Sequence, residues 1–543
     1  MSTIAYFSAE YSVADSLPIY AGGLGILAGD VVMEAGAENL DFHAFGLVYH
    51  QAFTSGDDDK RPMTERLLAE GFARVVGADG RPLALKVPVG KDQVAVGAWR
   101  RPYGRTSLTL LDTDIEDNTA EWREVSQHLY DGRPGMMWFQ QIVLGLGAVA
   151  LLEHDGVEPD IYHLNEGHMA MVGLAVALRY QRLNPKLTLV QTIDAVRRRL
   201  VATKHTIMHG GGLTLDRPTL EATLEPLLSS SRGSVDDIMN LASDDGVYLF
   251  TTKLVLALTC RKSGVSRIHV RMEAVTHPGS PVFPITNGVY APRWRAGSLD
   301  GEPLGYSDCQ LWEAHNLNRR ALIDYAAAQN GQKLHPDHLT VVWARRMTAY
   351  KRPELLITDI TRLLALAKHA TRPIQFVMAG QANSFDPAGV EIMNRVIEAA
   401  KMPELSAAFV YLPHYNPATA RLLVQGADVW LNTPQRGMEA CGTSGMKASL
   451  NGALQLSTSD GWIDEVDTEP IGWVIPEENS ATALYDLLEQ RVAPLFYARD
   501  EQGQGLPTDW MVKMRANIEL IEKDFTAARM LDDYYGQLYA VSK

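Results

Sequence analysis

The chain has 543 residues, of which 46% are hydrophobic and 21% charged, and its formal net charge is -15. This balance is typical of a globular protein with more than one domain, and the negative charge argues against nucleic acid or an anionic membrane as a partner. The three cysteines fit neither a zinc site nor a disulfide framework, which indicates a reducing compartment. The N-terminus lacks the pattern of a signal peptide, and the longest apolar run, residues 142–152, is about half a membrane span. We therefore expect a soluble, cytoplasmic protein.

Short apolar runs alternate with amphipathic stretches along the chain. Runs rich in Val, Ile and aromatic residues predict buried parallel strands. They are residues 187–193, 339–344, 374–380, 408–413 and 428–433. Helical patterns lie between them, as in residues 353–370 and 418–427. The alternation predicts an α/β protein with doubly wound sheets.

A segment rich in Pro, Gly and Asn, residues 281–297, is typical of a connector between domains. We expect two Rossmann-like lobes, residues 1–290 and 291–543, with an interdomain cleft between them. Ligands in such sheets bind beyond the carboxyl ends of the strands, where the two lobes would face each other. The last helical stretch, residues 511–539, is expected to pack back across the lobes.

The first candidate motif is YAGGLGILAGD, a glycine-rich segment before a helical pattern. Gly22 and Gly23 would let the backbone approach an anion near a helix N-terminus. The spacing differs from the G-x-G-x-x-G of dinucleotide sites, and a tight turn is an equally good interpretation.

Two further motifs precede the connector. The acids of LDTDIEDN, at a strand end, predict a solvated turn more than a glycosidase carboxylate pair. HLNEGH places two histidines five positions apart, a spacing that does not favour one helical face, so we expect no metal site there or elsewhere. In ITNGV, Asn287 is either a hydroxyl-binding residue or a turn residue.

The segment ARRMTAYKR follows the apolar run at residues 339–344. Its cations, Arg345, Arg346, Lys351 and Arg352, come directly after a predicted strand and so would point into the cleft. Arg offers forked donors to phosphate and Lys a compact charge, which indicates a phosphate site. The alternative is a solvated helix start, although cations there oppose the helix dipole.

The segment EACGTSGMKASLNG combines small polar residues with a lysine before an apolar helical run. Thr443, Ser444 and the backbone amides could hold a phosphate group, and Lys447 could form the imine of pyridoxal phosphate. Glu439 could accept hydrogen bonds from sugar hydroxyls. An ordinary helix lysine is an equally good interpretation of Lys447 on these residues alone.

Together these segments resemble the α-glucan phosphorylase family of glycogen, starch and maltodextrin phosphorylases, in particular its short bacterial and archaeal branch. The resemblance spans nearly the whole chain. It is carried by AYFSAEY, SLPIYAGGLGILAGD, LLDTDIEDN, YHLNEGH, ITNGVYAPRW, LWEAHNLNRRALIDY, ARRMTAYKR, FVMAGQA, DVWLNTPQRGMEACGTSGMKASLNGALQLSTSDGWIDE and GWVIP. It implies a GT-B-type glycosyltransferase fold and pyridoxal 5′-phosphate on Lys447. It also implies reversible phosphorolysis, in which an α-1,4-glucan and phosphate give glucose 1-phosphate and a glucan one residue shorter.

The resemblance implies roles for the residues that match the family's motifs. Contacts to substrate phosphate are implied for Arg346, Lys351 and the glycine-rich loop at Gly22 and Gly23. Contacts to the cofactor are implied for Arg345, Thr443, Ser444 and Tyr415. Contacts to the glucose hydroxyls are implied for Glu439, Cys441, Gly442, Tyr350, Asn287 and the backbone of His205. The cofactor phosphate would relay a proton through the substrate phosphate with retention of configuration, which explains why cations outnumber acids in these motifs.

The chain departs from the family pattern around His205, where ATKHTIMHGGG replaces a proline-containing turn and carries Lys204, Ile207 and Met208. The basic AVRRRL precedes it, and His50 stands where short members commonly have arginine. These changes surround the 6-hydroxyl and acceptor sides, so the preferred glucan stays open, as does assembly into a homo-oligomer. Two alternatives are kept: a glycosyltransferase of the same fold that uses a nucleotide sugar, and a catalytically weakened glucan-binding protein.

Overall fold

A computed structural model describes residues 2–53, 59–207, 211–229, 231–332, 334–383, 386–500 and 505–540. The chain divides into two compact units. Unit 1 comprises Met1–Val265, Val270–Ile285 and Leu531–Lys543, and unit 2 comprises Ser266–His269 and Thr286–Met530.

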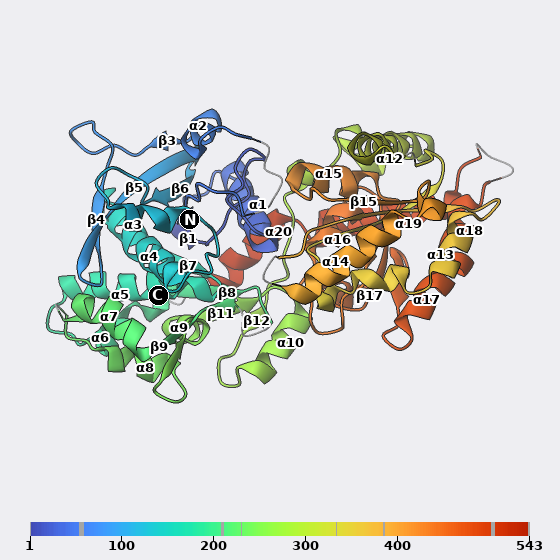
Figure 1. The fold of residues 1–543 in the computed structure, drawn as a ribbon. Coiled ribbons are helices and arrows are strands. Elements are labelled where there is room, and N and C mark those ends of the chain that lie inside the picture. The colour runs from blue at the N-terminus through green and yellow to red at the C-terminus, as the bar shows by residue number, and fades with distance from the viewer. Residues whose placement is uncertain are drawn as a thin grey trace. The chain divides into compact units, whose positions relative to one another are not determined.

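Unit 1 is built on a ten-stranded sheet in the order β12-β11-β8-β7-β1-β2-β6-β5-β3, with β4 paired to β5 (Figure 1). Neighbours from β12 to β6 are parallel, whereas β5 runs antiparallel to β6, β3 and β4. The strand order reverses at β1, between β2 and β7, as in a doubly wound sheet. The strands are β1 (Ile4–Phe7), β2 (Phe42–Leu47), β3 (Ala73–Arg74), β4 (Leu85–Val89), β5 (Asp92–Tyr103), β6 (Thr106–Asp112), β7 (Ile161–Asn165), β8 (Leu200–Lys204), β11 (Arg261–Gly264) and β12 (Phe283–Pro284), and a separate pair is formed by β9 (Thr214–Asp216) and β10 (Tyr248–Phe250).

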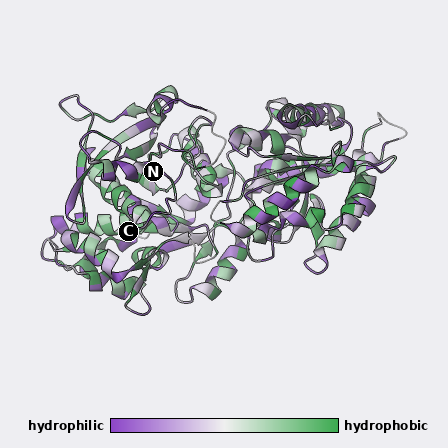
Figure 2. Ribbon diagram, viewed as in Figure 1, coloured by the Kyte–Doolittle hydropathy of each residue, from purple (hydrophilic) through white to green (hydrophobic). Residues whose placement is uncertain are grey.

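The helices of unit 1 are mostly amphipathic, and Figure 2 shows hydrophobic and hydrophilic residues alternating along them. They are α1 (Gly23–Ala37), α2 (Met63–Ala69), α3 (Ala120–Arg123), α4 (Met136–His154), α5 (Ala170–Leu183), α6 (Leu189–Val196), α7 (Arg217–Leu228), α8 (Val235–Ala242) and α9 (Thr251–Leu258). Among the described residues, only α4 is long and apolar enough to cross a membrane, and most of its residues are buried within the protein, where it packs against α5. Core packing therefore accounts for its composition.

One predicted strand of unit 1 is wrong. Within residues 187–193, Thr188 is the N-cap of α6 and residues 189–193 form the start of that helix, not a strand. Thr188 accepts a hydrogen bond from the Gln191 backbone N–H at 3.3 Å, and the Gln191 side chain accepts one from the Thr188 N–H at 3.0 Å. This capping box starts a helix whose buried residues recur at helical spacing, at Leu189, Thr192, Ile193 and Val196. The β-branched residues alone suggested the strand.

Replacing Thr188 with alanine should therefore lower the free energy of unfolding of unit 1 by about 1 kcal/mol, the usual value of an N-cap side chain. Urea denaturation followed by circular dichroism measures it. Thr119 is a matched control, because it stands at the N-cap of α3 without a side-chain capping bond. If Thr119→Ala lowers the free energy of unfolding as much as Thr188→Ala does, the Thr188 cap does not stabilise α6.

The run of acids that begins with Asp112, the last residue of β6, is also not a simple solvated turn. Asp112 is fully buried, and its carboxylate accepts a hydrogen bond from the Trp99 indole N–H at 3.1 Å. His50, the residue that departs from the family pattern, lies 3.1 Å from the other oxygen. Glu116 and Asp117 are exposed, as expected. Asp112 thus belongs to the interior of unit 1.

Unit 2 contains a six-stranded, fully parallel sheet in the order β15-β14-β13-β16-β17-β18 (Figure 1). Its strands are β13 (Leu339–Ala344), β14 (Ile374–Ala379), β15 (Phe409–Leu412), β16 (Val429–Asn432), β17 (Leu454–Thr458) and β18 (Gly472–Ile475). The first four confirm the predicted runs. Numbered along the chain, the order is that of the Rossmann fold, and it reverses between β13 and β16. An α/β protein with parallel sheets is therefore confirmed.

The helices of unit 2 are α11 (Ala291–Trp294), α12 (Asp308–Asn330), α13 (Ile360–Ala367), α14 (Pro387–Ala400), α15 (Pro417–Gly426), α16 (Thr443–Ser449), α17 (Ser480–Leu487), α18 (Ala493–Tyr497) and α19 (Thr508–Asp524). α10 (Arg267–Thr276) and α20 (Ala527–Asp533) each include residues of both units. The last helical stretch is broken at Phe525, whose carbonyl accepts a hydrogen bond from the Val289 N–H at 2.9 Å. The residues after Met530 belong to unit 1.

Candidate active site

The candidate site of unit 2 lies where its strand order reverses. Arg345 follows β13 directly, and the loop from Thr433 to Gly442 follows β16. In doubly wound sheets, the connections that leave two neighbouring strands in opposite directions open a crevice at their carboxyl ends. The topology therefore brings together two predicted motifs, ARRMTAYKR and the segment before Lys447.

At the centre of this site, one carboxylate is paired with two cations. Glu439 Oε2 lies 2.6 Å from Arg345 Nη2 and 3.1 Å from Lys351 Nζ, and all three residues are buried. Burial alone would raise the pKa of Glu439, but Arg345 and Lys351 hold it at about 2. Glu439 is therefore ionised at neutral pH and serves as a hydrogen-bond acceptor, not as an acid.

Three other polar residues of ARRMTAYKR, Arg346, Tyr350 and Arg352, are less buried. Arg346 is exposed, and Tyr350 is half-buried with its ring 5.1 Å from Lys351 Nζ. Arg352 has a positive φ of 46° and donates hydrogen bonds to the carbonyls of Thr433 and Pro434, so it supports the loop after β16. Only part of the motif therefore faces the carboxylate.

Lys447 lies on α16 with its amine against an aromatic ring. Its Nζ is 3.9 Å from the centre of the Trp294 ring, and the residue is 7% exposed. Asn451 fixes both partners, because its side-chain N–H groups donate to the carbonyls of Lys447 at 2.9 Å and Trp294 at 3.0 Å. An ordinary surface lysine has none of these features. The sequence analysis missed Trp294 and Asn451, although both lie within quoted motifs.

Small polar residues surround the start of α16. Thr443 is its first residue, and the Ser444 hydroxyl is buried without a hydrogen-bond partner among the described residues. Gly442 has a φ of 85°, and a side chain there would lie 3.6 Å from Arg345 Nη2. Tyr415 donates a hydrogen bond to the Ala344 carbonyl at 3.3 Å, and burial raises its pKa to about 12.

Asn287 contacts Cys441, which lies two positions after Glu439 in the chain. The Cys441 sulfur accepts a hydrogen bond from the Asn287 backbone, and burial raises the pKa of its thiol. The Asn287 side-chain oxygen is buried and unpartnered within the described part of the chain. Such an oxygen is stabilised by a hydrogen-bond donor, which a ligand could supply.

Three predicted site residues belong to unit 1. Gly22 is the N-cap of α1, Gly23 is its first residue, and no strand directly precedes them. The His205 N–H donates to Glu166 Oε2 at 2.9 Å, and its ring lies 2.7 Å from Asn165 Oδ1. Lys204, the departure before it, is buried with its Nζ 2.6 Å from Glu273 Oε1. Met208 lies outside the described residues.

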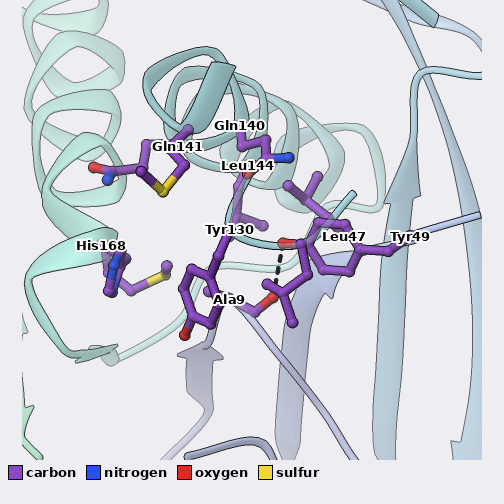
Figure 3. Close-up of a pocket in the computed structure, with 11 residues that line it drawn as sticks. Ala9, Leu47, Tyr49, Tyr130, Gln140, Gln141, Leu144 and His168 are labelled. Atoms are coloured by element: carbon purple, nitrogen blue, oxygen red, sulfur yellow. Dashed lines mark hydrogen bonds between the residues drawn. The ribbon is translucent and has the colours of Figure 1, made fainter. Parts of the chain in front are cut away.

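Unit 1 also has a pocket beside α4 that the sequence analysis did not predict (Figure 3). Apolar and aromatic side chains line it, together with Gln141 and His168. Two of the lining residues are joined directly, because the Tyr49 hydroxyl donates a hydrogen bond to the Ala9 carbonyl at 2.9 Å. Burial lowers the pKa of His168 to about 4, so its imidazole is neutral at pH 7.

Several known proteins are similar in sequence to this chain over nearly its whole length. A family model described as carbohydrate phosphorylase matches residues 308–472. Glycogen phosphorylase of Aquifex aeolicus (strain VF5) is 32% identical, over 99% of this chain and 86% of that protein. Glycogen phosphorylase of Mycobacterium tuberculosis (strain CDC 1551 / Oshkosh) is 34% identical and maltodextrin phosphorylase of Thermococcus litoralis is 30% identical, each over 99% of this chain and 70% of the relative. The resemblance drawn from the motifs is thus confirmed, and the chain belongs to the carbohydrate phosphorylase family.

Proposed function

We propose that the protein is an α-glucan phosphorylase, a hexosyltransferase that reversibly converts an α-1,4-glucan and phosphate to glucose 1-phosphate. The observation that carries the proposal is the unit 2 site, where Lys447 lies buried on Trp294 and Glu439 is held between Arg345 and Lys351. Relatives named glycogen and maltodextrin phosphorylase support the same activity. A cytoplasmic location and a homo-oligomeric state stay predictions.

The residues around α16 fit pyridoxal 5′-phosphate. Lys447 has a buried amine on an aromatic face, and the unpartnered Ser444 hydroxyl suits a phosphate oxygen. Arg345 and Thr443 would add further donors, and Tyr415 would lie near the ring. When bound, the cofactor would supply a phosphate group that exchanges a proton with the substrate phosphate.

The chain's own residues would bind and orient the substrates. Arg346 and Lys351 would hold the substrate phosphate, while Glu439 would accept hydrogen bonds from the glucose 2- and 3-hydroxyls beside Tyr350. The amides of Cys441 and Gly442 and the Asn287 oxygen would complete the sugar site. Because the pKa of Glu439 is about 2, it is a poor general acid, and we assign it the role of hydrogen-bond acceptor; retention of configuration stays a prediction.

We further propose a GT-B arrangement, in which unit 1 contributes to the substrate site from across a cleft. Among the described residues of unit 1, no heavy atom lies within 4 Å of the place that a side chain at Gly22 or Gly23 would take, and neither glycine has a positive φ. Their own unit therefore does not require glycine there, which supports close approach by a phosphate or sugar. The His205 backbone would contact the 6-hydroxyl.

Gly23→Ala should therefore fold normally and yet lower kcat/KM for phosphate by about tenfold or more, because a methyl group would hinder the approach of an anion to the backbone. Thermal denaturation and phosphorolysis kinetics measure the two effects. Gly25→Ala is the contrasting variant, since its side chain would lie 2.6 Å from Tyr20 Cβ and should destabilise the protein. Unchanged kinetics in Gly23→Ala would remove the glycine-rich loop from the proposed site.

Release of glucose 1-phosphate from maltodextrin and phosphate tests the function. A phosphorylase gives this product and carries a cofactor absorbance band that borohydride reduction locks onto Lys447. A nucleotide-sugar enzyme would instead gain thermal stability when UDP or ADP binds, and its Lys447→Ala variant would remain active. A weakened glucan-binding protein would retain glucan and release no product, and either result would overturn the proposal.

A further inference from the structure

The turn that follows β17 contacts the loop that carries Glu439. Asp460 is 1% exposed, and its Oδ2 accepts hydrogen bonds from the backbone N–H groups of Met438 at 3.1 Å and Glu439 at 2.9 Å. Its other oxygen accepts the Gly461 N–H at 2.9 Å. One buried carboxylate thus fixes the backbone at the residue whose side chain meets Arg345 and Lys351.

The same turn fixes the loop on the far side of Glu439. The Trp462 N–H donates to the Cys441 carbonyl at 2.9 Å. Gly461 has a φ of 56°, and a side chain there would lie only 2.1 Å from the Cys441 carbonyl oxygen. The turn therefore requires glycine and fits closely against the loop. Glu439 is held by this turn on both sides.

Asp460 is the N-cap of the short helix Gly461–Glu465, and its carboxylate is buried. Among the described residues no cation forms an ion pair with it, and burial raises its pKa to about 6, with the nearby Glu439 adding to the rise. Glu439, by contrast, has two cationic partners. A buried carboxylate without a cation disfavours folding unless its hydrogen bonds compensate. The hydrogen bonds that compensate are those from the backbone N–H groups of Met438, Glu439 and Gly461, so the burial of Asp460 depends on the loop that carries Glu439.

We propose that Asp460 is a positioning residue that sets the place of the Glu439 carboxylate and so determines selectivity for the sugar 2-hydroxyl. The inference rests on the proposed function, in which Glu439 accepts hydrogen bonds from the 2- and 3-hydroxyls of glucose. Asp460 does not touch the substrate. It acts through the backbone of Met438 and Glu439, which determines where the Glu439 side chain starts.

The test compares two substrates in one enzyme sample. Phosphate release in the presence of maltodextrin gives kcat/KM for glucose 1-phosphate and for 2-deoxyglucose 1-phosphate. The ratio of the two does not depend on the fraction of folded protein, so a merely structural role would leave it unchanged. In Asp460→Ala we expect this ratio to fall by about tenfold or more, the usual effect of one charge-assisted hydrogen bond. Asp460→Asn, which keeps one carbonyl acceptor, should give a smaller fall.

Asp467 is a matched control. It is exposed, and its carboxylate also accepts a backbone hydrogen bond, from the Glu469 N–H at 3.1 Å. Asp467→Ala should keep the wild-type ratio. The double variant Asp460→Ala/Glu439→Gln should have the same ratio as Glu439→Gln alone, because both changes remove one interaction.

Each outcome is decisive. A parallel loss of kcat/KM for both substrates in Asp460→Ala, or an additional loss of selectivity in the double variant, would overturn the positioning role while the wild type remained an active phosphorylase. If Asp460→Ala does not fold, an unchanged ratio in the isosteric Asp460→Asn overturns the inference in the same way. If the wild type releases no phosphate from glucose 1-phosphate, the proposed function fails first and the inference fails with it.

Discussion

Lys447→Ala should remove both the cofactor absorbance band and phosphorolysis, and it should do so without unfolding unit 2. Lys447 provides the only amine proposed to bind the cofactor, and its Nζ lies 3.9 Å from the centre of the Trp294 ring in a buried site. A methyl group cannot form the imine. Absorbance spectra and borohydride labelling with peptide mapping measure the first property, a phosphate-dependent assay measures the second, and circular dichroism measures whether the variant is folded.

Lys513 provides the control for this variant. Its Nζ also lies over a tryptophan ring, 5.7 Å from the centre of Trp473, but on α19 and away from the loop after β16. Lys513→Ala should keep the absorbance band and the activity. If Lys447→Ala retained either property, the cofactor would be held elsewhere, and the proposed site would be wrong.

Lys351→Met should lower kcat/KM for phosphate by about 10²- to 10³-fold, the usual effect of removing one preorganised donor from a developing or bound anion. Lys351 Nζ lies 3.1 Å from Glu439 Oε2, so the variant also removes one of the two cations that lower the pKa of Glu439. Arg345, the larger of the two coulombic causes that lower this pKa, remains in the variant, so we expect Glu439 to stay ionised at neutral pH. The loss should therefore appear in phosphate kinetics, while the cofactor band remains.

Lys401 is the control, because it forms an ion pair with Glu398 at 2.9 Å on the surface, where both side chains are more than half exposed. Such pairs contribute little to stability. Lys401→Met should leave phosphate kinetics and thermal stability nearly unchanged. Equal kinetic constants in Lys351→Met and Lys401→Met would show that the buried cation does not bind substrate phosphate.

Several features of unit 2 were predictable because each depends on residues close together in the chain. Parallel strands buried on both faces appear as short apolar runs, and β13 to β16 coincide with four of them. Glu439, the small polar residues before Lys447 and Lys447 itself lie in one continuous motif. Where local signals competed, prediction failed. The β-branched residues at 187–193 suggested a strand, whereas the Thr188 capping box and the helical spacing of buried residues favour α6.

Contacts between distant residues were not predictable. The pairing of Lys351 with Glu439 joins residues 88 positions apart, and it depends on β13 and β16 being neighbours in the sheet. Asp112 looked solvated among its acidic neighbours, but the Trp99 indole and His50 bury it inside unit 1. No pattern near Asp460 in the chain indicated that its carboxylate would hold the Glu439 backbone.

By itself the sequence determined the α/β class, through the periodicity of its apolar runs, and the resemblance to the family, through its contiguous motifs. Only the tertiary structure decided which carboxylate meets which cations, that Trp294 covers the Lys447 amine, and that Asp460 supports the loop between them. The physical reason is that hydrogen bonds and ion pairs act over a few ångströms. The order of strands in the sheet, not the spacing along the chain, brings these groups within that range.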